Sequence, residues 1–319
     1  MKAIVYRTYG SPDVLELTDI DTPAVADDAV LVRVRAASVN ALDWHAMRGQ
    51  PFLVRMEDGL RRPKVGALGV DAAGHVEAVG SNVTHVQPGD EVFGARTGAL
   101  AEYVSGRNFV AKPAGLSFEQ AAAIPVAATT ALQGLRDKGG LQPGQRVLIN
   151  GASGGVGTFA VQIAKALGGH VTGVCSSGNV EMVRSIGADE VIDYTREDFT
   201  RAGEKYDIIL DIAGSRSLRS CRRVLTAKGT LVVVGGPGGR WVSPADRWVK
   251  AKVISRFGSQ RMLPFLAQIT REELLVLKEL AEAGKLRPVI DRTYPLSEIP
   301  EAVRYVEAGH AKGKVVITI

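Results

Sequence analysis

The stretch RVLINGASGGVGTFAVQIAKALG, residues 146–168, passes from a short apolar strand through a glycine cluster into an apolar helix. Apolar side chains recur at helical spacing from Val156 to Leu167. The glycines allow a tight turn and close packing of the helix on the strand. Because the first N–H groups of such a helix lack partners, they can bind a phosphate. The stretch is typical of a turn that holds a dinucleotide pyrophosphate.

The motif departs from the strict G-x-G-x-x-G pattern, because Ala152 stands at the first position. It also matches G-x-x-G-x-x-G through Gly151, Gly154 and Gly157, and G-x-S-x-G with Ser153 in the place of a hydrolase nucleophile. All three patterns require a strand, a turn and a helix. The motif alone therefore leaves a nucleotide site, a nucleophile elbow and a plain structural turn open.

Further strands follow at the spacing of βαβ units. Residues 170–175, HVTGVC, form a second predicted strand, and three more are expected at 191–193, 207–212 and 230–234. Helical or turn segments separate them. This order predicts an α/β fold with a doubly wound, parallel sheet of five strands.

The end of the second strand bears on the choice of dinucleotide. Residues 175–178, CSSG, provide no acid where an NAD enzyme places one against the ribose, so nothing there repels a 2′-phosphate. Ser176 and Asn179 can donate hydrogen bonds to that phosphate, and Tyr194 can close the site. These residues predict NADP as the cofactor. Ser176 and Asn179 could equally cap the helix that starts near residue 180.

Length and composition suggest a globular protein of two domains, because 319 residues exceed one ordinary core. The sequence has no run of membrane-spanning length and starts with a strand-like segment, which predicts a cytoplasmic protein without a membrane partner. Cys175 and Cys221 are too few for a disulfide framework. The net charge of +5 is modest and scattered, which argues against nucleic-acid binding.

The possible metal ligands are dispersed along the chain. The five histidines, at 45, 75, 85, 170 and 310, are never paired at ligand spacing, and neither cysteine has a partner nearby. We expect no metal site. Without a Lewis acid, the pKa of an alcohol substrate would not be lowered in the way a zinc enzyme achieves.

The N-terminal part has a different sequence pattern: apolar side chains recur at every second residue, which predicts strands at 29–36, 73–79 and 90–93. Turn residues at 112–117 lead into a helix at 118–122, and helices at 272–283 and 299–308 precede a last strand at 314–319. We predict a mostly β domain over 1–120, a nucleotide-binding domain over 121–262, and a segment over 263–319 that returns to the first domain.

Ordered motifs run along nearly the whole chain: ASVN at 37–40, GVDAAG at 69–74, PGDEVFG at 88–94, AIP at 123–125 and GHAKGKVV at 309–316. With the glycine turn, they resemble the medium-chain dehydrogenases/reductases in their zinc-less quinone oxidoreductase branch. Asn40 matches the position of a metal-binding cysteine in zinc-bearing relatives. Residues 69–71 match their Gly-His-Glu motif.

This resemblance implies a GroES-like, mostly β catalytic domain beside a Rossmann domain, and a homodimer. It implies hydride transfer from NADPH to a small-molecule quinone or enone without zinc, in a cleft between the domains. The implied catalytic residues are Asn40, Asp43, His45 and Thr129, the last beside the nicotinamide. The implied cofactor contacts, besides Ser176, Asn179 and Tyr194, are Ser153, Gly154, Gly155 and Val156 at the pyrophosphate, and Gly235 and Gly236 after the fifth strand.

Other interpretations remain. Asn40 and Asp43 could merely hydrogen-bond a turn, and His45 could be a packed surface histidine. An alcohol or aldehyde oxidoreductase, or an RNA-binding protein with little turnover, would use the same nucleotide fold. A hydrolase could assemble Ser153, Asp211 and His310 in chain order.

Overall fold

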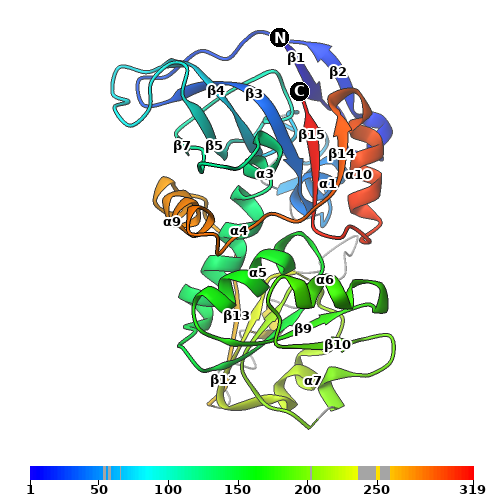
Figure 1. Ribbon diagram of the computed structural model, residues 1–319. Coiled ribbons are helices and arrows are strands. Elements are labelled where there is room, and N and C mark those ends of the chain that lie inside the picture. The colour runs from blue at the N-terminus through cyan, green and yellow to red at the C-terminus, as the bar shows by residue number, and fades with distance from the viewer. Residues whose placement is uncertain (53–54, 57–58, 65, 202, 236–248, 252–258) are drawn as a thin grey trace. The chain divides into compact units, whose positions relative to one another are not determined.

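The computed structural model describes residues 1–319 except 53–54, 57–58, 65, 202, 236–248 and 252–258. The chain forms two compact units, one of Met1–Thr129 with Ile269–Ile319 and one of Thr130–Gln268 (Figure 1). The predicted boundaries at 120 and 262 lie short of these. Helix α3 (Phe118–Ala122) packs on strands of the first unit, and β13 (Arg261–Pro264) pairs within the second.

Within its described residues, the first unit holds a seven-stranded sheet in the order β14-β15-β3-β4-β5-β7, with β6 also paired to β3. Neighbouring strands are antiparallel except β14 and β15. A separate pair, β1 and β2, is antiparallel. The bounds are Lys2–Val5 (β1), Glu16–Asp19 (β2), Val30–Val39 (β3), Asp71–Val79 (β4), Glu91–Ala95 (β5), Tyr103–Gly106 (β6), Asn108–Ala111 (β7), Ile290–Pro295 (β14) and Lys314–Thr318 (β15).

The C-terminal strand completes the first unit. β15 runs antiparallel to β3, with Val315 opposite Val39, and Val315 and Ile317 are buried in one core with Val303 of α10. Burial of these apolar side chains stabilises the return of the chain. Figure 1 shows α10 alongside β14 and β15. The described residues of this unit also form the α-helices α1 (Ala41–Arg48), α9 (Arg271–Glu282) and α10 (Ile299–Glu307), while α4 (Pro125–Leu132) contains the boundary.

The second unit confirms the predicted parallel, doubly wound sheet. Its described residues form six strands in the order β10-β9-β8-β11-β12-β13, and every neighbouring pair is parallel. The predicted number of five strands was wrong, because β13 is a short edge strand. The other bounds are Arg146–Asn150 (β8), His170–Cys175 (β9), Glu190–Asp193 (β10), Tyr206–Asp211 (β11) and Leu225–Val233 (β12).

Helices α5 (Gly155–Ala166) and α6 (Val180–Ser185) lie on one side of this sheet and α7 (Leu218–Arg223) on the other (Figure 1). The chain moves outward from β8 in one direction through β9 and β10, then in the other through β11, β12 and β13. Ligands of open α/β sheets bind beyond the carboxyl ends of the strands where this reversal occurs. The glycine turn follows β8, at that point of the sheet.

Candidate functional site

The glycine turn has the backbone geometry of a phosphate-binding loop. Gly151 has a φ of 95°, and a Cβ on Gly157 would lie 2.0 Å from the Gly151 carbonyl oxygen. Only glycine permits that approach. Helix α5 begins at Gly155, and its N-cap residue, Gly154, provides no side-chain cap. The first-turn N–H groups therefore remain available to an anion.

Three of the predicted cofactor residues come together beside this turn. The Asn179 side chain donates from Nδ2 to Ser176 Oγ at 3.0 Å and to Ser153 Oγ at 3.3 Å. Its Oδ1 is buried and has no hydrogen-bond partner within the described chain. An unpaired buried acceptor is costly unless a ligand satisfies it. The hydroxyl groups of a ribose fit that acceptor, so these residues suit a dinucleotide.

The structure corrects the expectation that no carboxylate lies near the end of β9. Asp193 ends the neighbouring strand β10 opposite Cys175, and its Oδ2 accepts a hydrogen bond from Ser177 Oγ at 2.5 Å. Arg196 lies 3.4 Å from the same carboxylate. Hydrogen bonds from Ser177 and Thr195 lower the pKa of Asp193. Asp193 belongs to β10, the strand next to β9 in the sheet. The sequence alone does not show that the end of β10 lies beside the residues that follow β9.

For the other residues predicted to bind the cofactor, the structure gives burial and backbone contacts. Val156 is half-buried in the first turn of α5. Tyr194 is 54% exposed, and its backbone N–H bonds the Cys175 carbonyl at 3.0 Å. A Cβ on Gly235 would lie 2.3 Å from the Ile212 carbonyl oxygen, so only glycine fits there. Gly236 lies outside the described residues.

In the first unit, Asn40 belongs to a buried polar network. Its Nδ2 donates to Asp71 Oδ2 at 2.8 Å, and its Oδ1 accepts from Lys314 Nζ. Ser38 Oγ also donates to Asp71 Oδ2, at 2.7 Å. Asp71 Oδ1 accepts the Val126 N–H at 2.9 Å, at the start of α4. The network joins the ends of three strands and a helix, and its side chains are all buried.

Asp43 lies next to this network but faces the backbone. Its carboxylate accepts the Asn40 N–H at 2.7 Å and the Gly69 N–H at 3.2 Å, which caps α1. Burial raises the pKa of Asp43 to about 7, assisted by the charge of Asp71 and opposed by those N–H groups and Lys314. The contacts of Asp43 are those of a turn-stabilising residue.

His45 and Thr129 complete the set of predicted catalytic residues. The His45 ring stacks on Trp44 with centroids 3.6 Å apart, and its Nδ1–H donates to the Gln50 carbonyl at 2.8 Å. Burial lowers the pKa of His45, so a neutral ring is favoured. Thr129 is fully buried in α4, and its Oγ1 has no partner in the part of the chain that the structure describes. That hydroxyl is available to a bound group.

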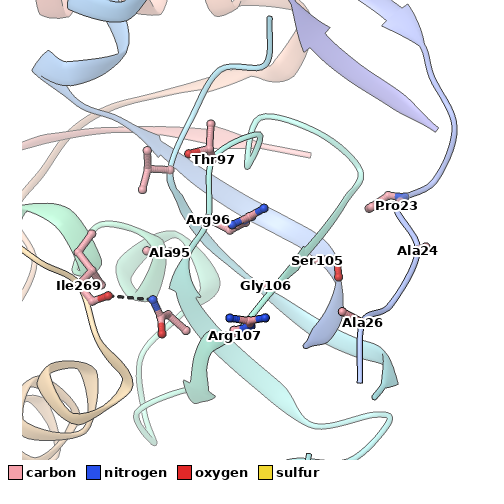
Figure 2. A pocket seen from close by; sticks show the side chains of 12 residues that line it. Pro23, Ala24, Ala26, Ala95, Arg96, Thr97, Ser105, Gly106, Arg107 and Ile269 are labelled. Carbon is pink, nitrogen blue, oxygen red and sulfur yellow. Dashed lines mark hydrogen bonds between the residues drawn. The ribbon is translucent and has the colours of Figure 1, made fainter. Parts of the chain in front are cut away.

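A groove of about 700 Å³ also opens on the first unit, where Arg96, Thr97 and Arg107 contribute to its wall (Figure 2). Arg107 pairs with Asp28 at 2.7 Å. Val70, the neighbour of Asp71, reaches the same wall. None of the predicted site residues lines this groove, so it is separate from the predicted site.

The described residues contain no group of three or more His, Cys, Asp or Glu that could hold a metal ion. No helix among them is long and apolar enough to cross a membrane. In the hydrolase interpretation, an asparagine is hydrogen-bonded to each of two triad members: Asn179 donates to Ser153 Oγ at 3.3 Å, and Asn150 donates to Asp211 Oδ1 at 2.7 Å.

Comparisons with known proteins agree with the fold. Residues 26–133 match the family described as alcohol dehydrogenase GroES-like domain, and residues 186–317 the family described as zinc-binding dehydrogenase. The mitochondrial NAD(P)H oxidoreductase RTN4IP1 of Mus musculus is 37% identical, over 100% of this chain and 89% of that protein. The quinone oxidoreductase of Coxiella burnetii superposes with a TM-score of 0.87 and 33% identity, over 100% of this chain and 99% of that one.

This chain is a medium-chain dehydrogenase/reductase of the quinone oxidoreductase branch. Its membership confirms the resemblance seen in the motifs. Among other members of the superfamily, a chloroplastic NADPH-dependent alkenal/one oxidoreductase of Arabidopsis thaliana is 33% identical, over 99% of this chain and 79% of that protein. The Escherichia coli quinone oxidoreductase, solved in complex with NADPH, has a TM-score of 0.86 at 27% identity, with 100% of both chains covered.

Proposed function

We propose that this protein is an NADPH-dependent reductase that transfers a hydride to quinones or α,β-unsaturated carbonyl compounds without a metal ion. The observation that carries the proposal is the cluster of Ser153, Ser176 and Asn179 beside the uncapped start of α5. Together they offer backbone donors for a pyrophosphate and an unpaired acceptor for a ribose. The names of the NADPH-dependent and quinone-reducing relatives support the same chemistry.

The residues of this chain would bind and orient rather than supply a strong acid. A bound nicotinamide supplies the hydride. The first turn of α5 would hold the pyrophosphate through Gly155 and Val156, and Thr129 Oγ1 would hydrogen-bond a bound group. Asn40 would donate from Nδ2 to the oxygen on which negative charge develops. Because the lowered pKa of His45 favours the neutral ring, we expect water to protonate that oxygen.

Oxidation of NADPH at 340 nm, measured with a panel of quinones, enones and aldehydes, tests this proposal. We expect turnover with quinones and enones, faster with NADPH than with NADH, and unchanged after thorough chelation. Turnover only with simple aldehydes would favour the alcohol or aldehyde oxidoreductase. Dependence on added zinc would refute the metal-free reaction.

The variant Gly155→Asp tests the cofactor site directly. It places a negative charge and added bulk at the start of α5, where the pyrophosphate is expected, so NADPH binding should be lost in a fluorescence titration. An unchanged thermal unfolding curve would show that the fold is intact. Unaltered NADPH affinity in that folded variant would rule out the site.

Two further expectations concern the setting of the reaction. The homodimer stays a prediction, which sedimentation equilibrium tests. The cytoplasmic location also stays a prediction, because relatives named above are described as mitochondrial and chloroplastic.

A further inference from the structure

Lys314 is a charged residue in a position where an apolar one would be expected. It begins β15 and is 3% exposed. Because Val315 pairs with Val39, the strand register sets Lys314 beside Asn40. Burying an ammonium group is unfavourable unless other groups compensate its charge and its donors.

The compensation comes from residues of the candidate site. Lys314 Nζ donates to Asn40 Oδ1 and lies 3.3 Å from Asp71 Oδ2, which is fully buried. Asp71 Oδ2 also accepts Asn40 Nδ2. The ammonium can bind only the oxygen of the Asn40 amide, and the carboxylate only its nitrogen. The two charges therefore fix one orientation of that amide.

This arrangement also changes how strongly the amide donates. A charged donor on Oδ1 draws electron density from the amide, which strengthens hydrogen bonds donated by Nδ2. One Nδ2 hydrogen is used by Asp71. The other has no acceptor that the described residues provide, so it is free for a bound molecule.

We propose that Lys314 is a positioning residue for the reduction: it orients and polarises the Asn40 amide, whose free N–H then binds the oxygen of the reacting quinone or enone. This inference rests on the proposed function and extends it to a residue outside the predicted site. The cation that the site uses is thus internal to the chain and does not itself touch the substrate.

The first test is the variant Lys314→Met, measured by steady-state kinetics with NADPH and a small quinone. We expect kcat to fall about tenfold, less than the hundredfold or more that follows loss of an oxyanion donor itself. KM for NADPH should stay within about twofold, because Lys314 does not belong to the cofactor-binding residues. Lys112→Met is the matched control: Lys112 is a lysine of the same unit, with a side chain 8% exposed, that pairs with Glu91.

Lys314→Met leaves the Asp71 charge buried without a counter-charge, so it could impair folding. The double variant D71N/K314M removes both charges and should fold. Its kcat should also be about tenfold lower than that of the wild type, because Asn40 Oδ1 still has no hydrogen bond from a lysine ammonium group. The role of Lys314 would be refuted if the double variant had the kcat of the wild type. It would also be refuted if kcat fell as much in Lys112→Met as in Lys314→Met.

A cycle with Asn40→Ala separates this inference from the proposed function. If Lys314 acts through Asn40, Lys314→Met should cause no further loss of kcat once Asn40 is alanine. A full additional tenfold loss would overturn the inference while leaving the function in place. If Asn40→Ala alone leaves kcat unchanged, both the donor role of Asn40 and the role of Lys314 fail, although NADPH oxidation itself persists.

A spectroscopic measurement needs no turnover. In the cofactor-free protein, the side-chain amide signal of Asn40, assigned by its loss in Asn40→Ala, should shift in Lys314→Met and stay in place in Lys112→Met. An Asn40 signal that is the same in all folded variants would show that Lys314 does not polarise this amide.

Discussion

Burial gives Asp43 an unusual effect on the stability of the fold. Its pKa is raised from 3.8 to about 7 in the folded protein. Between those values the folded chain holds a proton that the unfolded chain has released, so the unfolding free energy falls as pH rises and levels off above pH 7. The full loss is about 4 kcal/mol, from roughly three pKa units at ~1.4 kcal/mol each. Urea unfolding from pH 4 to pH 8 measures it.

The variant Asp43→Asn should lose this part of the pH dependence. At pH 4 it should be less stable than the wild type, because the Asn40 and Gly69 N–H groups bind different carboxyl oxygens and an amide has only one oxygen. This difference should shrink as pH rises and the wild type loses stability. Asp13→Asn is the control, since a hydrogen bond from Ser11 and the charge of Arg304 lower the pKa of that exposed residue. If the unfolding free energy of Asp43→Asn fell between pH 4 and pH 8 as much as that of the wild type, a group other than Asp43 would cause the pH dependence.

A second prediction at the residue scale concerns Asp193, whose carboxylate lies beside Ser177 near the expected ribose. Its negative charge opposes a 2′-phosphate, while Arg196 partly offsets it. Asp193→Asn should therefore raise the ratio of kcat/KM for NADPH to that for NADH several-fold, and Arg196→Gln should lower it. Asp189→Asn, at the other end of β10, should leave the ratio unchanged. A lower ratio in Asp193→Asn would mean that the carboxylate does not face the phosphate.

Single residues of the site were predictable only where neighbouring parallel strands end together. Ser153, Ser176 and Asn179 meet because β8 and β9 are adjacent and both feed turns at the same edge. Asp193 was not predicted, because its hydrogen bond with Ser177 depends on the pairing of β10 with β9. Lys314 was missed for a similar reason. Its contact with Asn40 depends on strands far apart in sequence, which no local pattern records.

At the scale of elements, apolar runs bounded by glycine or proline were enough to locate β8 and β9, and the turn residues at 112–117 were enough to locate the start of α3. β13 was not predicted, because its four residues, RMLP, show neither alternation nor a long apolar run. Pairing along β12 forms this strand in spite of its sequence. Tertiary pairing therefore decides this edge strand, whereas local sequence was enough to locate the buried strand β8.

The junction of β8 and α5 allows an element-scale prediction. In Gly157→Ala the added Cβ would lie 2.0 Å from the Gly151 carbonyl oxygen, so the helix must move away from the turn. We expect a loss of about 1–3 kcal/mol in unfolding free energy and weaker NADPH binding. Gly178→Ala is the control, because nothing lies within 4 Å of its added Cβ. Equal stability of the two variants would contradict the close packing of α5 on the turn.

For the whole molecule, the two cysteines report on the second unit alone. Cys175 and Cys221 both lie within Thr130–Gln268 and are buried, and burial raises the pKa of Cys175 to about 11. A thiol reagent should therefore react with Cys175 only after this unit opens. NADPH at a hundred times its Kd lowers the population of any open form that cannot bind it about a hundredfold. Labelling of Cys175 in Cys221→Ser should slow by that factor.

A cysteine placed in the first unit completes this comparison. Ala36 is fully buried in β3, so Ala36→Cys in a chain with both natural cysteines replaced by serine reports the opening of that unit. Most residues proposed to hold NADPH belong to the second unit, so the cofactor should slow labelling of Cys175 more than labelling at position 36. Equal slowing would show that the units open together. No slowing at Cys175, at an NADPH concentration proven to saturate, would place the cofactor outside the second unit.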